Sequence, residues 1–142
     1  MTLSQCPCVD DKANLQESML DEISDAGFYA QIANEALTDE LKAIIISIVG
    51  DEYGHARLQA ALLGICPPGP ACLTATQSAT GNFAADVATA VTGELDAIHR
   101  YAELANCAPT MGVRLLLTSI LGDEYAHCRI WTAMLLASSL CG

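Results

Sequence analysis

The residues best suited to chemistry lie in an eight-residue segment that the chain contains twice, 72 positions apart. The first copy is Gly50-Asp51-Glu52-Tyr53-Gly54-His55-Ala56-Arg57, and the second is Gly122-Asp123-Glu124-Tyr125-Ala126-His127-Cys128-Arg129. Each copy contains Glu-x-x-His, and residues three apart on a helix share a face. One carboxylate and one imidazole from each copy can therefore point to the same place, which is an arrangement suited to binding a metal ion.

The same offset relates an earlier pair of segments. Glu22 falls on Glu94, and Tyr29 falls on Tyr101. The chain therefore reads Glu, Glu-x-x-His, Glu, Glu-x-x-His, which is the ligand pattern of helical bundles that hold two metal ions between carboxylates and histidines. The predicted metal ligands are Glu22, Glu52, His55, Glu94, Glu124 and His127.

Four carboxylates inside an apolar bundle cannot all remain charged without cations, because an isolated buried carboxylate costs several kcal/mol or takes up a proton. Divalent metal ions remove that cost. A donor set rich in oxygen with two nitrogens suits iron or manganese, whereas thiolates would suit zinc. We therefore expect two iron ions, with manganese as the other choice, bridged by two glutamates and closed at each end by a histidine.

Four further residues are expected to lie around these ligands. Asp51 and Asp123 each precede a ligand glutamate and could accept a hydrogen bond from a ligand imidazole, which fixes its tautomer; the alternative is a solvated acid. Tyr29 and Tyr101 lie two helical turns after Glu22 and Glu94, so they face the same site. They are either core tyrosines with a hydrogen-bond partner or redox-active or proton-donating groups.

The spacing of apolar residues predicts four helices that position these side chains. The first runs from Asp10 or Asp11 to about Leu37, and the second follows a cap at Thr38 and ends near Gly64. The third follows a cap at Asn82, and the fourth follows a turn at residues 106–110. Residues 1–10 have no periodicity and are predicted to form a tail.

Residues 65–81 contain three of the five prolines and are predicted to connect the second and third helices. Seventeen extended residues reach about 56 Å and a 26-residue helix is about 39 Å long, so this segment can return along a whole bundle. Glu22 and Glu52 are equally distant from residue 37, as Glu94 and Glu124 are from residue 109, so the carboxylates fall at one height. The sequence predicts an all-α four-helix bundle, a single domain over 1–142 with a long crossover and an internal two-fold repeat.

The composition excludes several classes of partner. A formal net charge of -11 with only six basic residues argues against nucleic acid. The longest apolar run, 43–49, is too short to cross a membrane, and the N-terminus has no secretory pattern. We expect a soluble cytoplasmic protein that forms a homodimer or a larger homo-oligomer.

The seven cysteines are an odd number and are expected to be reduced. In a bundle with a long crossover, the start of the first helix and the ends of the second and third lie at one end. Cys6, Cys8, Cys66 and Cys107 would then be neighbours. They are predicted to form a redox or metal-binding cluster, or else to be small apolar fillers.

These motifs resemble the rubrerythrin and bacterioferritin branch of the ferritin-like superfamily over roughly residues 11–138. The resemblance implies di-iron ligands at the six positions given above, tyrosines near the centre at Tyr29 and Tyr101, and supporting acids at Asp51 and Asp123. The chain differs from rubrerythrins at Ala97, where an additional glutamate is typical, and residues 1–142 contain no four-cysteine rubredoxin module. Any electron donor, such as rubredoxin, is therefore expected to be a separate protein.

The resemblance implies an oxidoreductase that reduces hydrogen peroxide or dioxygen in defence against oxidative stress. The alternative is a ferroxidase that handles or stores iron with the same centre. A third interpretation is a structural bundle that keeps metal only for stability, since a bound ion stabilises any fold that forms its site.

Overall fold

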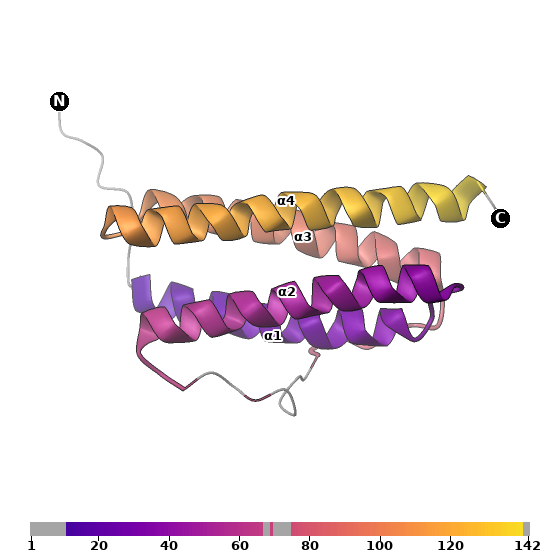
Figure 1. Cartoon of the computed structure of the whole chain (residues 1–142), viewed down its shortest axis with the longest axis horizontal. Coiled ribbons are helices and arrows are strands. Elements are labelled where there is room, and N and C mark those ends of the chain that lie inside the picture. The colour runs from indigo at the N-terminus through magenta and orange to yellow at the C-terminus, as the bar shows by residue number, and fades with distance from the viewer. Residues whose placement is uncertain (1–10, 67–68, 70–74, 141–142) are drawn as a thin grey trace.

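The computed structural model describes residues 11–66, 69 and 75–140, and its described secondary structure consists of four α-helices (Figure 1). They are α1 (Asp11–Ala33), α2 (Asp39–Leu63), α3 (Phe83–Asn106) and α4 (Met111–Leu140). Helices α1 and α2 form one antiparallel hairpin and α3 and α4 form the other. The connection from α2 to α3 is long, as predicted. The all-α four-helix bundle is therefore confirmed.

Local sequence explains where the helices begin and end. The Thr38 side chain accepts a hydrogen bond from the Leu41 N–H at the start of α2, and the Asn82 side chain does the same for Ala85 at the start of α3. Gly64 ends α2 with a φ of 70°, a left-handed conformation that glycine adopts without steric cost. Both caps were predicted.

Helix α1 ends earlier than predicted, at Ala33 and not near Leu37. Backbone hydrogen bonds from Asn34 to Gln31 and from Glu35 to Ile32 tighten the chain into a turn at this point. The Glu35 side chain then accepts a hydrogen bond from the Gly81 N–H at 3.0 Å, which ties this turn to the end of the crossover. That distant contact overrides a local helical pattern.

The crossover lies against α1 where it approaches α3. The Ser24 hydroxyl accepts a hydrogen bond from the Thr76 N–H at 3.0 Å, and the Gln31 side chain accepts one from the Ala79 N–H at 2.8 Å. A Cβ at Gly27 would come within 3.0 Å of the Ala75 nitrogen, so only glycine allows this approach without a shift. The close contact explains why Gly27 has no counterpart in the second half, where His99 is exposed.

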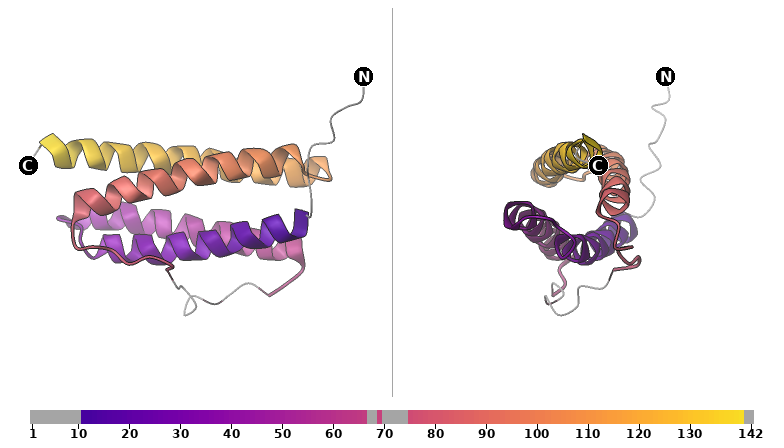
Figure 2. Two further views of the ribbon diagram at one scale, coloured as in Figure 1. Left: turned by 180° about the vertical axis from the view of Figure 1, so that it is seen from behind. Right: turned by 90° about the vertical axis from the view of Figure 1, so that its right-hand side faces the viewer.

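Viewed end-on, the helices follow the order α4, α3, α1, α2 around the bundle (Figure 2). Each hairpin packs closely, α1 also packs against α3, and contact between α2 and α4 is sparser than contact between α1 and α3. Buried apolar residues form one cluster around Ile32, Ile45 and Trp131, and others toward the opposite end around Ile120 and Ala60. The predicted ligands lie between these layers. Within the described part of the chain, no helix is long and apolar enough to cross a membrane.

Candidate metal centre

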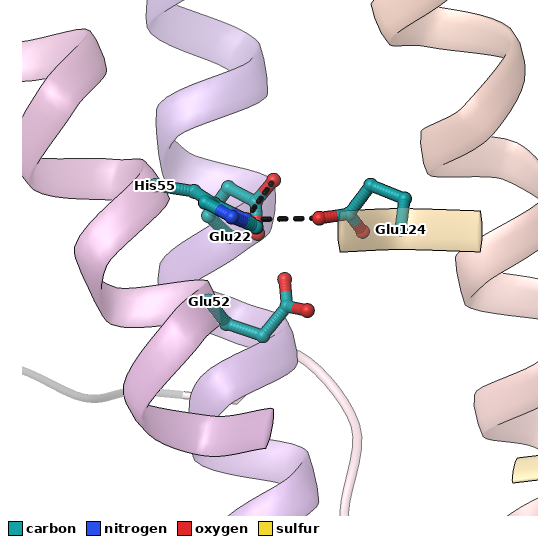
Figure 3. Close-up of side chains that lie close together, drawn as sticks. All are labelled: Glu22, Glu52, His55 and Glu124. Atoms are coloured by element: carbon teal, nitrogen blue, oxygen red, sulfur yellow. Dashed lines mark ion pairs between the residues drawn. The ribbon is translucent and has the colours of Figure 1, made fainter. Parts of the chain in front are cut away.

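All six predicted ligands are buried in the middle of the bundle, with at most 3% of any of them exposed. Their donor atoms form two groups, and within each group the atoms lie within 4.8 Å of one another. The first group is Glu22, Glu52, His55 and Glu124; the second is Glu52, Glu94, Glu124 and His127. These two groups could hold two metal ions. Figure 3 shows the first group, in which α1, α2 and α4 each contribute a carboxylate.

Glu52 and Glu124 belong to both groups, so each of them could contribute to the binding of both ions. The distances are nearly two-fold symmetric. His55 Nδ1 lies 2.8 Å from Glu124 Oε1, and His127 Nδ1 lies 2.8 Å from Glu52 Oε1. Toward the outer carboxylates, His55 Nδ1 lies 3.9 Å from Glu22 Oε1 and His127 Nδ1 lies 3.7 Å from Glu94 Oε1. Each histidine therefore lies against a shared glutamate from the other half of the chain.

The donors fit metal ions because their inward atoms lack other partners. Within the described residues, eight buried side-chain atoms of the six ligands have no hydrogen bond: both carboxylate oxygens of Glu52 and Glu124, Oε2 of Glu22 and Glu94, and Nδ1 of His55 and His127. A buried polar atom left unsatisfied costs about 1–3 kcal/mol. Cations between these atoms would remove that cost, and six oxygen and two nitrogen donors are the set that iron or manganese takes.

The histidines are oriented by aspartates on the far side of each ring. His55 Nε2 lies 2.9 Å from Asp123 Oδ2, and His127 Nε2 lies 2.9 Å from Asp51 Oδ2. A carboxylate accepts hydrogen bonds, so Nε2 carries a proton in each ring and Nδ1 is the nitrogen that could bind a cation in the centre. The predicted aspartate–imidazole contacts are present, and each of them joins the two halves of the chain.

Glu22 is held by a hydrogen-bonded pair of polar residues. The Tyr101 hydroxyl donates to Glu22 Oε1 and accepts a hydrogen bond from Gln59 Nε2 at 2.6 Å. All three side chains are fully buried. The pair leaves Glu22 Oε2 free to bind a cation.

Glu94 is held differently. The Trp131 indole N–H donates to Glu94 Oε1 at 3.2 Å, and the ring of Tyr29 lies against that of Trp131 at 4.9 Å between centroids. Gln59 and Trp131 occupy equivalent positions in the repeat, because 72 residues separate them. The sequence predicted that both lie in the core but did not predict these contacts. Their equivalent positions in the repeat were the only sign that they share a role.

In the absence of metal, several side chains of the centre bind protons more tightly than they would in water, and metal ions would replace these protons. Burial, followed by the charge of Glu22, raises the pKa of Glu52 well above 4.5. Burial and the hydrogen bond to Glu124 raise the pKa of Glu94 to about 11. Burial acts to lower the pKa of His55, but Glu124 and Glu22 outweigh it and raise the value to about 11. Without metal, bound protons thus supply the positive charge that the carboxylates require.

Arg100 lies beside the Glu22 side of the centre. Its guanidinium donates to Ser18 Oγ at 3.1 Å and to Asp21 Oδ2 at 3.0 Å, and its Nη2 lies 3.8 Å from Glu22 Oε1. Burial and the charge of Glu22 raise the pKa of Asp25 to about 7. The second half has no equivalent group, since Phe28, Ala90 and Gly93 hold the positions related to Arg100, Ser18 and Asp21.

The predicted cysteine cluster is tested only in part. Cys66 carries an exposed free thiol and Cys107 is disulfide-bonded, so these two are not paired with each other. The expectation of reduced thiols is wrong for Cys107. Cys6 and Cys8 lie outside the described residues, and the cluster itself stays a prediction.

No protein-family model matches the chain, and no curated protein matches it. The fold and the geometry of the centre therefore carry the assignment. They describe a four-helix bundle with two buried carboxylate and histidine groups, consistent with a ferritin-like di-metal site.

Proposed function

We propose that the protein is a non-haem di-iron oxidoreductase that reduces hydrogen peroxide or dioxygen in the manner of rubrerythrins. The observation that supports this best is the pair of groups sharing Glu52 and Glu124, because two ions held by common carboxylates are close enough to act on one substrate. Glu22, Glu52, His55 and Glu124 would hold one ion, and Glu52, Glu94, Glu124 and His127 the other. When bound, the iron pair supplies electrons by changing valence.

The chain's own residues would control water and protons. Apolar layers above and below the centre exclude bulk water. Reduction of one hydrogen peroxide to two waters consumes two electrons and two protons. The hydroxyl of Tyr101, hydrogen-bonded to Glu22, is placed to hold a proton at the centre, and Asp25 near the Glu22 side is a further carrier. The electrons would come from a separate donor protein such as rubredoxin.

The test is anaerobic loading with ferrous iron followed by titration with peroxide and, separately, with air, while the absorption of the oxidised iron pair is recorded. We expect two irons per chain and much faster oxidation by peroxide. Rapid oxidation by air with continued uptake beyond two irons would instead favour the ferroxidase and storage function. Failure to bind two irons would overturn the ligand assignment. A Glu52→Ala variant serves as the control, since it removes a carboxylate common to both groups.

A further inference from the structure

The two boundaries between the hairpins differ in the residues that line them. One side is the boundary between α1 and α3, and the other is the boundary between α2 and α4, which we call the α2/α4 seam. The seam consists of Gly50, Asp51, Gly54 and His55 from α2 with Gly122 and Asp123 from α4. A surface pocket of about 620 Å³ opens here, lined by most of these residues with Arg57, Leu58, Ala61 and Ile65, so its two aspartates outnumber its one arginine.

Glycines keep the seam open. A Cβ added at Gly50, Gly54 or Gly122 would meet no atom within 4 Å, so these positions adjoin empty space. The sparse contact between α2 and α4 agrees with this, and in the end-on view the two helices stand apart (Figure 2). A small hydrated ion can therefore approach the bundle between them.

Negative charge lies at the opening and leads directly to the centre. The side chains of Asp51 and Asp123 are 52% and 54% exposed. His55 lines the pocket but is only 3% exposed. Its Nε2 lies 2.9 Å from Asp123 Oδ2, and its Nδ1 lies 2.8 Å from Glu124 Oε1. Its Nδ1 has no hydrogen bond. One imidazole ring thus connects the exposed acids with the buried carboxylates.

At the opposite boundary an arginine lies directly beside a ligand carboxylate. Arg100 from α3 is hydrogen-bonded to Ser18 and Asp21 of α1, and its guanidinium lies 5.3 Å from the Tyr101 ring centroid. The guanidinium Nη2 lies 3.8 Å from Glu22 Oε1, so its positive charge repels a metal ion that approaches Glu22 from this boundary. Asp21 and Asp25 lie near the guanidinium, but they do not separate it from Glu22 Oε1.

We propose that the α2/α4 seam is the access route of divalent cations to the centre, with Asp51 and Asp123 attracting the ion and the His55 ring marking its point of passage. The proposal rests on the proposed function to the extent that the centre must bind two ions. It adds the path by which they arrive and leave.

The test measures the rates of metal binding separately from the equilibrium. Cobalt(II) is mixed with the full metal-free chain in a stopped-flow instrument and followed by its visible absorption, and release is measured with excess chelator. The variant is Gly54→Leu, which adds bulk to the seam at a position where a Cβ meets no atom within 4 Å beyond its chain neighbours, and which favours helix over glycine. The matched control is Gly112→Leu, at an exposed glycine near the start of α4 and outside the pocket.

We expect Gly54→Leu to slow binding and release by the same factor of several-fold, leaving the dissociation constant and the stoichiometry of two unchanged, while Gly112→Leu retains the original rates. Raising the ionic strength should slow binding to the original chain by up to ~10-fold, because electrostatic attraction is screened. Two ions bound with unaltered rates in Gly54→Leu would overturn the access route and leave the proposed function intact. No cobalt binding by the original chain would overturn both.

Discussion

The Glu22/His55 position and the Glu94/His127 position have the same donors but different surroundings. Each has one outer glutamate, one histidine and the shared Glu52 and Glu124. Around Glu22 lie a tyrosine, an amide and a guanidinium; around Glu94 lie an indole and a tyrosine ring. The repeat is therefore retained where a cation needs a ligand. It has diverged where a side chain needs only to donate a hydrogen bond to the outer glutamate, as Tyr101 does to Glu22 and Trp131 does to Glu94.

The largest expected effect comes from the shared carboxylates. Replacing Glu52 or Glu124 by alanine should remove both ions, because each glutamate belongs to both groups. Replacing Glu22 or Glu94 should remove only one. The loss at the shared positions should exceed the ~10–100-fold weakening typical of an outer hydrogen-bond partner. Calorimetric titration with cobalt(II) gives the stoichiometry, and a Glu52→Ala variant that keeps one ion at the original affinity would show that the glutamate is not shared.

A smaller effect is expected from the aspartates, and it should appear in the opposite half. Asp51→Asn should weaken the ion held by His127, and Asp123→Asn the ion held by His55, each by ~10–100-fold, because the hydrogen bonds cross between halves. The check is a double-mutant cycle. In a His127→Ala background, Asp51→Asn should cause no further loss; an additive loss would mean that the aspartate acts without that ring.

The metal-free protein should lose stability as the pH rises, and the two outer glutamates should contribute unequally. The folded pKa values of Glu94 and His55, about 11, lie above their usual 4.5 and 6.5, so the folded state binds more protons than the unfolded state between those limits. The metal-free protein is therefore most stable at a pH below the usual pKa values, and it loses stability as the pH rises toward the folded pKa values. The midpoint of thermal unfolding should drop by roughly 5–10 °C between pH 6 and 8.

Two glutamine variants sharpen that prediction. Glu94→Gln imitates the protonated acid, so it should be tolerated without metal and should reduce the dependence of the midpoint on pH. Glu22 differs. Burial acts to raise its pKa, but hydrogen bonds with Glu52 and His55 outweigh burial and lower the pKa below 4.5. Glu22→Gln should therefore destabilise the metal-free chain. Equal effects of the two variants in thermal unfolding at pH 6 would contradict the assigned proton distribution.

The smallest effect separates the two tyrosines. Tyr101→Phe removes the donor to Glu22 and the acceptor for Gln59, and we expect a loss of about 1–3 kcal/mol in the free energy of unfolding. Tyr29→Phe should cost less, because the Trp131 N–H still donates to Glu94. Urea denaturation of both variants in the metal-free form measures the difference. A greater loss for Tyr29→Phe would reverse the comparison.

The sequence predicted the helices and the convergence of the six side chains because both depend on short-range spacing. Glu-x-x-His fixes two groups on one helical face, and equal distance from a turn fixes the height of Glu22 against Glu52. Thr38 and Asn82 identified helix starts through local hydrogen bonds. These features need no knowledge of which helices become neighbours.

Other contacts could not be predicted because they depend on the packing of one hairpin against the other. The pairing of Asp51 with His127, and not with the histidine of its own segment, requires α2 and α4 to face each other across the centre. The hydrogen bonds of Gln59 to Tyr101 and of Trp131 to Glu94 depend on the same packing. The early end of α1 followed from a contact between Glu35 and Gly81, which are far apart in the sequence.

The sparse contact between α2 and α4 has a mechanical consequence. Four of the six ligands come from these two helices, while they pack against each other less than α1 packs against α3. The α1/α3 boundary is therefore the main direct connection between the hairpins, and bound metal ions would join the hairpins at the α2/α4 edge. Gain or loss of metal would change the stiffness of the whole molecule, and the separation of the hairpins would depend on the number of ions bound.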